Sequence, residues 1–152
     1  MLRTESGGIT INVTAPETVR RFDDVTLHCD YRVDGNGDRL YALRWFHNSV
    51  PVIRYSPLLQ PQIRGAAASR TLRVNLASSS GKRLHLDAVD WNVTGTWTCQ
   101  IMAEAPSFET MEASTHLKVI GQITSLYSHF LSVSIIFTIF DKILNNRITF
   151  SI

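Results

Sequence analysis

Residues 25–31 read Val-Thr-Leu-His-Cys-Asp-Tyr, and this stretch decides the fold class of the chain. Val25, Leu27, Cys29 and Tyr31 share one parity, and the residues between them are polar. A strand with one buried face alternates in this way, because successive side chains point to opposite faces of a sheet. The pattern therefore predicts a strand whose cysteine points into a core.

The same alternation continues through the rest of the first 120 residues, without a convincing helical stripe of ten or more residues. Further strands are predicted near residues 41–45, where Tyr41, Leu43 and Trp45 share the inward parity, and near 52–55, 72–76, 84–89, 97–101 and 115–119. Pro51 and Pro57 border the second of these, which indicates an edge strand. Residues 58–69 show no clear period. Eight or nine short strands separated by turns predict an all-β sandwich or barrel.

The two cysteines choose between these architectures. Cys29, Trp45 and Cys99 all lie on the inward parity of their strands. The order Cys, Trp, Cys matches the immunoglobulin sandwich, in which a disulfide between the sheets packs against a buried tryptophan. A disulfide closing a loop of about 70 residues stabilises a domain by roughly 4 kcal/mol. We therefore expect a variable-type sandwich of two antiparallel sheets over residues 9–120, with room for two additional strands after Trp45.

Trp97 stands two residues before the second cysteine, where such domains carry the tyrosine of the tyrosine corner. Its indole ring shares the inward parity of Cys99, so both Trp45 and Trp97 are predicted core residues. The indole N–H is expected to donate the hydrogen bond that the phenol would have made.

Composition argues against several functional classes. Fifteen basic residues balance thirteen acidic ones, and no dense Lys/Arg block suggests a nucleic-acid or anionic-membrane surface. Two cysteines cannot form an all-cysteine zinc site. The sequence has no HExxH, GxSxG or glycine-rich phosphate loop, and its five histidines are scattered. We expect a protein that is not an enzyme and needs no metal or cofactor; a Cys/His nucleophile built on Cys29 or Cys99 is the less favoured alternative.

The predicted disulfide also indicates an oxidising compartment, outside the cell. Two Asn-x-Thr sequons, at Asn12 and Asn92, fall on a first strand and in a loop and agree with secretion. Residues 1–8 have no basic start, apolar stretch or cleavage site of a signal peptide, so a longer precursor is expected. The predicted location is extracellular, at the plasma membrane or secreted, with glycosylation at both asparagines.

Binding residues are predicted on the outward face of the sheet that carries Trp45. The outward parity, with the next strand, presents candidate contact residues: Arg44, Phe46, Arg54, Tyr55, Gln100 and Met102. An exposed phenylalanine needs a cover, and Arg and Tyr are enriched at interface hot spots. The alternative is that Phe46 and Tyr55 only cover each other. Phe108, at the centre of the loop Glu104–Glu109, is either a further contact or a plug over the end of the sandwich.

Four segments suggest a family. Leu27–Tyr31, Leu40–Phe46, Arg54–Pro57 and Ala103–Thr110 together resemble the first immunoglobulin domain of the beaten path family, which comprises insect neuronal cell-surface and secreted proteins. The resemblance spans residues 9–120 and implies heterophilic binding to sidestep-like immunoglobulin proteins in axon guidance and cell adhesion. The runner-up is an immunoglobulin-domain receptor, or a homophilic adhesion protein, of a different recognition system.

Residues 121–152 form an apolar tail of different composition. Its only formal charges are Asp141, Lys142 and Arg147, and residues 123–140 carry none. A spanning helix needs about 20 residues, so 123–140 is a marginal transmembrane segment. A lipid-anchor signal fits worse, because the apolar run does not reach the C-terminus. The third interpretation is a gene-model artefact, the translation of an AT-rich intron.

Overall fold

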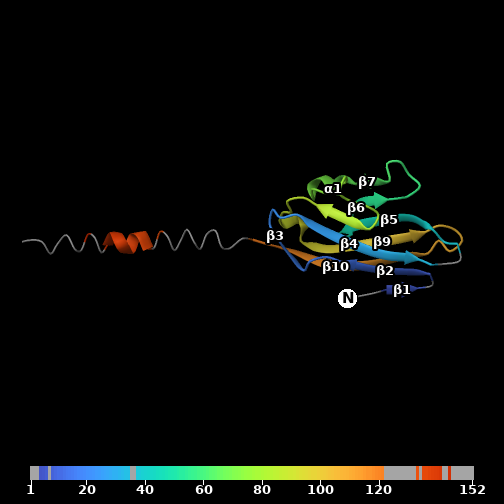
Figure 1. The fold of residues 1–152 in the computed structure, drawn as a ribbon, viewed down its shortest axis with the longest axis horizontal. Helices are drawn as coiled ribbons and strands as arrows, with labels where there is room; N and C mark the ends of the chain where they lie inside the picture. The colour runs from blue at the N-terminus through green and yellow to red at the C-terminus, as the bar shows by residue number, and fades with distance from the viewer. Residues whose placement is uncertain are drawn as a thin grey trace, which may run out of the picture. The chain divides into compact units, whose positions relative to one another are not determined.

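The computed structural model describes residues 4–6, 8–34, 37–121, 133, 135–141 and 144 of the 152. The chain divides into two compact units, Met1–Ile120 and Gly121–Ile152. The first unit consists of two facing β-sheets with a short helix at one margin (Figure 1). Residues 133, 135–141 and 144 of the second unit are helical.

The smaller sheet contains four antiparallel strands. Their spatial order is β1 (Thr4–Ser6), β2 (Ile9–Thr14), β4 (Val25–Val33) and β8 (Arg83–Leu86). In β4 the side chains of Val25, Leu27 and Cys29 are buried and those of His28 and Asp30 are exposed. The structure therefore confirms the alternation of buried and exposed side chains that predicted this strand.

The larger sheet contains six strands. Their spatial order is β3 (Thr18–Arg20), β10 (Thr110–Ile120), β9 (Gly95–Ala103), β5 (Leu40–His47), β6 (Val50–Tyr55) and β7 (Ile63–Gly65). β3 runs parallel to β10, and all other neighbours are antiparallel. β6 and β7 extend the sheet beyond β5, as the two additional strands of a variable-type domain do.

The core lies between the sheets and is closed by one disulfide. Cys29 on β4 is bonded to Cys99 on β9, with a Cα–Cα distance of 6.3 Å. Trp45 stands opposite Cys99 in the β5–β9 ladder and is 0% exposed. The all-β, variable-type sandwich is thus confirmed, with ten strands in the described residues where the sequence predicted eight or nine.

Trp97 makes the predicted corner contact. Its indole Nε1–H donates to the carbonyl oxygen of Val93 at 3.1 Å, inside the buried core. Val93 ends a short 3₁₀ helix, η1 (Trp91–Val93), whose start is capped by the Asp90 side chain accepting from Trp91 N–H. The tryptophan therefore holds the β8–β9 connection against the sheet as a corner tyrosine would.

The structure corrects three local predictions. Residues 72–76 are not a strand: the helix α1 (Ala67–Thr71) precedes them, Arg73 has a positive φ of 57°, and Val74 makes only an isolated bridge. β6 is not an edge strand, because β7 pairs with its outer side. Tyr41 is exposed instead of inward, because a register shift between Leu40 and Ala42 reverses the parity there.

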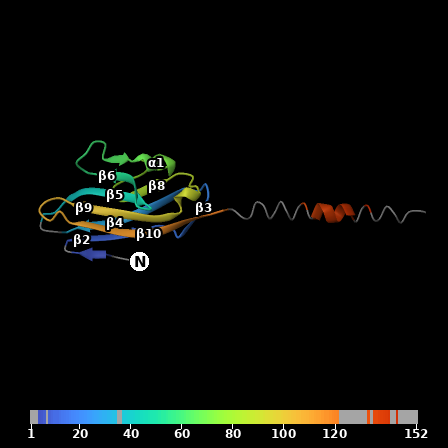
Figure 2. The same ribbon diagram turned by 180° about the vertical axis from the view of Figure 1, so that it is seen from behind.

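Seen from behind, the layers keep the same order, and α1 lies at the margin of the larger sheet near β6 (Figure 2). In the part of the chain that the structure describes, no helix is long and apolar enough to cross a membrane. Most of the marginal span predicted at 123–140 lies outside the described residues, so the interpretations of the tail stay predictions.

Candidate functional site

One row of side chains crosses the outer face of the larger sheet. The ladders place Arg64 of β7 opposite Arg54 of β6, and Arg54 opposite Arg44 of β5. The same row continues from Arg44 to Gln100 on β9 and then to Glu112 on β10. We call Arg44, Arg54 and Arg64 the arginine row.

The arginine row brings like charges together without neutralising them. Neighbouring strands lie about 4.8 Å apart, and like charges directly opposite each other destabilise a sheet. Within the described residues, none of the three guanidinium groups pairs with a carboxylate. Arg64 Nη2 donates to Gln60 O at 3.2 Å, and the Arg54 guanidinium lies 5.5 Å from the centre of the Tyr41 ring. The Nε atoms of Arg44 and Arg54 are buried and have no hydrogen-bond partner.

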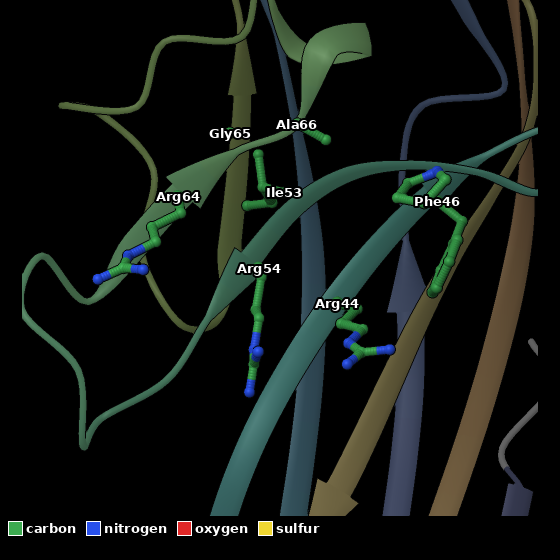
Figure 3. A pocket seen from close by; sticks show the side chains of 8 residues that line it. Arg44, Phe46, Ile53, Arg54, Arg64, Gly65 and Ala66 are labelled. Atoms are coloured by element: carbon green, nitrogen blue, oxygen red, sulfur yellow. The ribbon is translucent and has the colours of Figure 1, made fainter.

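A groove opens beside the arginine row. Its volume is about 320 Å³, and its lining is Arg44, Phe46, Pro51, Ile53, Arg54, Arg64, Gly65 and Ala66. Figure 3 shows Arg44 and Arg54 extending in the same direction from β5 and β6, with Arg64 on the adjoining strand. Phe46 stands opposite Pro51, next to a register shift in the β5–β6 ladder, and Ile53 is only 2% exposed. The groove therefore combines an apolar wall with three cationic side chains.

Most of the predicted contact residues lie on this face. Arg44, Phe46 and Arg54 line the groove. Gln100 and Met102, both half-buried, occupy the outward positions of the neighbouring strand β9. Whether they contact a partner stays a prediction; the structure gives their place.

Phe108 lies in the loop between β9 and β10, and its side chain is 73% exposed. The loop is closed on itself: Phe108 N–H donates to Glu104 O at 3.1 Å, and Glu109 N–H donates to Ser107 Oγ at 3.3 Å. A side chain this exposed does not plug the end of the sandwich, so that alternative is wrong. The contact role of Phe108 stays a prediction.

Tyr55 is placed differently from its prediction. It stands opposite Leu43, whose side chain is in the core, and it packs against the core from the inner side of β6. A Cβ atom at Gly81 would lie 2.6 Å from Tyr55 Cε1. Tyr55 and its neighbour Arg54 must point to opposite faces, because successive strand residues do. The outward prediction for Tyr55 was wrong, and so was the alternative in which it covers Phe46.

The inward position of Tyr55 also affects Tyr31 across the sandwich. Burial raises the pKa of the Tyr31 phenol above its usual value, and the nearby Tyr55 hydroxyl raises it further. Lys82 lies 5.4 Å from the Tyr31 ring centre. These contacts belong to the packing of the two sheets and not to the outer face.

Two residues of the outer face were missed from the sequence. Arg64 was not predicted, because residues 58–69 have no clear period. Only the pairing of β6 with β7 places Arg64 opposite Arg54. Tyr41 was assigned to the core because the bulge that exposes it leaves no signal in the alternation.

The two sequons lie on different elements, Asn12 on β2 and Asn92 in η1. Asn12 is half-buried on β2, opposite Asp30. Asn92 is exposed in η1, and its Nδ2 atom donates to Thr71 O at 3.0 Å. Thr94, the hydroxyl residue of the second sequon, accepts from Val119 N–H at 2.9 Å. Glycosylation at both sites stays a prediction.

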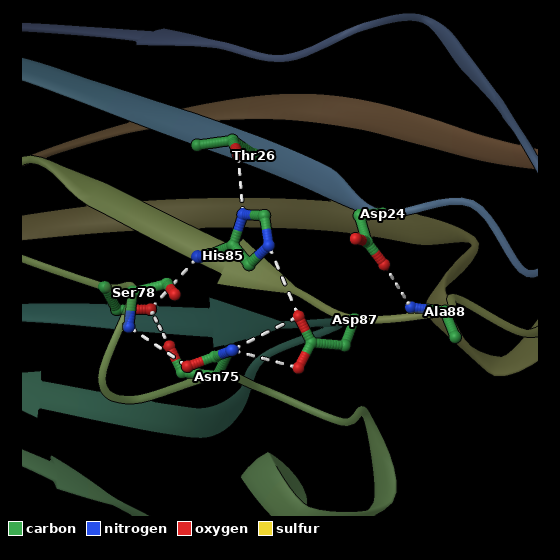
Figure 4. Close-up of polar contacts among 8 residues, drawn as sticks. Asp24, Thr26, Asn75, Ser78, His85, Asp87 and Ala88 are labelled. Atoms are coloured by element: carbon green, nitrogen blue, oxygen red, sulfur yellow. Dashed lines mark hydrogen bonds and ion pairs between the residues drawn. The ribbon is translucent and has the colours of Figure 1, made fainter.

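A cluster of Asp24, His85 and Asp87 lies on the other sheet, with possible ligand atoms within 4.8 Å of one another. Its atoms already have protein partners (Figure 4). The His85 ring bonds Thr26 Oγ1 at 2.8 Å and Asp87 at 3.3 Å, and Asn75 Nδ2 donates to Asp87 at 3.0 Å. This network ties β8 to β4 and to the turn that contains Asn75, which is a structural role.

Several solved structures share the architecture of this chain. Murine CRIg aligns with a TM-score of 0.52 at 18% sequence identity, over 76% of this chain and 99% of that chain. Murine CEACAM1b aligns at 0.56 and 19%, over 72% of this chain and 54% of its own. The V domain of amphioxus IgVJ-C2 aligns at 0.54 and 12%, over 68% and 98%. No protein-family model and no curated protein matches the sequence.

The fold, the disulfide between the sheets and the buried tryptophan define a variable-type immunoglobulin domain. The chain spans about half, 54%, of the CEACAM1b chain that it matches. At these identities the similarity establishes the fold, and the role of the outer face has to be argued from its own residues.

Proposed function

We propose that this domain is an extracellular, non-enzymatic recognition module that binds another immunoglobulin-superfamily protein through the outer face of its larger sheet. The observation that carries the proposal is the arginine row beside an apolar groove. Three unneutralised cations in one row cost stability, and a groove that includes Phe46 exposes apolar surface. Both features are explained by a partner that covers them.

The disulfide supports an extracellular location, because such bonds persist outside the reducing interior of the cell. The two sequons agree with that location. The resemblance of the four segments to the beaten path family makes a sidestep-like protein the first partner to test, with a role in axon guidance and cell adhesion. Homophilic adhesion is the second candidate, and it would require this face to complement itself.

The test is a binding screen of the 152-residue chain, secreted behind an added signal sequence, against sidestep-family ectodomains and against itself. The double variant Phe46→Ala/Arg54→Glu should weaken a specific interaction by more than about tenfold, the scale of a hot-spot loss. Arg32→Glu is the matched control, because Arg32 is exposed on β4 of the opposite sheet. Equal affinity of the double variant and the parent would move the binding site away from this face.

A further inference from the structure

We infer that the arginine row binds an extended acidic segment of the protein partner, with two carboxylates on alternate residues. The inference rests on the proposed function and names the chemistry of that same site. It takes the ligand from the charges and spacings of the described residues: Arg44, Arg54 and Arg64 stand on three adjacent strands with no carboxylate opposite any of them.

The spacing of the row selects alternate residues. Adjacent strands are about 4.8 Å apart, so the first and third arginines of the row are separated by roughly 10 Å at the backbone. An extended segment lying across the strands places every second side chain on the same face, roughly 7 Å apart. Two carboxylates at that interval both lie within the roughly 10 Å span of the row, each beside one of its outer arginines. Adjacent carboxylates do not, because one of them points away.

The state of the guanidinium groups favours a carboxylate ligand. No carboxylate of the described residues pairs with Arg44 or Arg54, and a carboxylate accepts from an arginine through two parallel bonds. The Arg54 guanidinium lies 5.5 Å from the centre of the Tyr41 ring, a cation–π contact that favours this position of the group. The row is therefore arranged in advance for a planar acceptor.

Two other occupants fit less well. A second copy of this chain offers one acidic side chain on the row, Glu112, for three arginines. A sulfated glycan would gain little from the apolar wall formed by Phe46, Pro51 and Ala66, whereas the side chains between two glutamates can pack there. The surface thus favours a protein segment of alternating acidic and apolar residues.

The experiment uses two synthetic peptides of identical composition and charge, one with Glu-Val-Glu at its centre and the other with Val-Glu-Glu. Each is titrated into the ¹⁵N-labelled full chain while the arginine Nε–H signals are followed. The Glu-Val-Glu peptide should shift the signals of Arg44 and Arg54 saturably and bind at least about threefold more tightly than its isomer, a difference that alternate spacing produces. Replacing all three arginines of the row by glutamine should weaken binding at least about tenfold.

The controls separate folding from recognition. Arg32→Gln, on the opposite sheet, should leave peptide binding unchanged, and Arg64→Gln alone tests the row at its most exposed member if the triple variant folds poorly. Equal affinity of the two peptides, or no saturable shift in the row, overturns the inference. A heparin-derived hexasaccharide that displaces the peptide and binds more tightly overturns it in favour of a glycan. If sedimentation shows a dimer of the parent chain and a monomer of Arg54→Gln, the inference is overturned in favour of a second copy.

The two proposals fail differently. A partner from the ectodomain screen whose binding is lost with Phe46→Ala but unchanged by Arg44→Gln and Arg54→Gln leaves the recognition face standing and refutes the acidic segment. Peptide binding through the row, with no partner found among the sidestep-family ectodomains or the chain itself, supports the acidic segment and refutes the sidestep-like partner.

Discussion

Arg54 is expected to lower the free energy of unfolding of the domain, and this effect can be measured without a partner. It stands between Arg44 and Arg64 in the ladders, so replacing it by glutamine removes two opposed like-charge pairs. Each such pair is unfavourable by about 0.2–1 kcal/mol. The change also removes the contact with the Tyr41 ring, worth about 0.5–1 kcal/mol at a partly exposed site. Arg54→Gln should therefore change the free energy of unfolding by between about −0.6 and +1.5 kcal/mol, with a small gain at the centre of that range.

The assay is urea unfolding of the parent chain and of Arg54→Gln, at low and at high salt. Salt screens the repulsion between partly exposed charges, so the gain in stability should be largest at low ionic strength and shrink as salt is added. Arg32→Gln, which removes a charge from the opposite sheet, should show no comparable gain. Destabilisation by more than about 1 kcal/mol at both salt concentrations would refute the reasoning, because it would make Arg54 a structural residue.

Three further predictions concern the rest of the domain. Trp97→Phe should lower the free energy of unfolding by about 2–4 kcal/mol, since it leaves the Val93 carbonyl unpaired and a void in the core; a denaturant midpoint that moves less than that contradicts the corner assignment. The hydrogen bond from Arg21 holds the pKa of Asp90 below its usual value, so Arg21→Gln should raise that pKa, as carboxyl NMR signals would show. Because the folded-state pKa of Asp90 is depressed, its contribution to stability is present above about pH 4 and is lost as the pH falls through the folded-state pKa. If Asp90 titrates at the same pH in Arg21→Gln as in the parent chain, the Arg21–Asp90 pairing is wrong. Phe108→Ala should change stability by less than about 0.5 kcal/mol, because the ring is exposed, and a larger loss in thermal unfolding would revive the plug interpretation.

The core of this domain was predictable because it depends on one simple quantity, the parity of apolar residues along each strand. Cys29, Trp45 and Cys99 keep that parity from sequence to structure, so the disulfide and the sandwich followed from it. Tyr41 escaped because a bulge changes parity without changing composition.

The candidate site was less predictable, because it depends on pairing between strands. Arg44 and Phe46 were found from the alternation of one strand, but Arg64 joins them only through the β6–β7 ladder. Tyr55 differs for another reason: it shares a hot-spot residue type with its neighbour Arg54, but adjacent strand residues point to opposite faces, so residue type does not indicate its face. The alternation along one strand thus predicts which side chains face outward, whereas the arginine row can be seen only when the register between the strands is known.

The shortness of the outermost strands has a consequence for how such a module can be joined to others. β7 and β3, at the two margins of the larger sheet, are three residues long, and β7 carries a charged side chain and a glycine. Short charged margins resist backbone pairing with another chain, which protects against fibril formation. Crowding at a surface, or repetition in tandem, should therefore not join the larger sheets edge to edge, which favours attachments made face-on, by side chains.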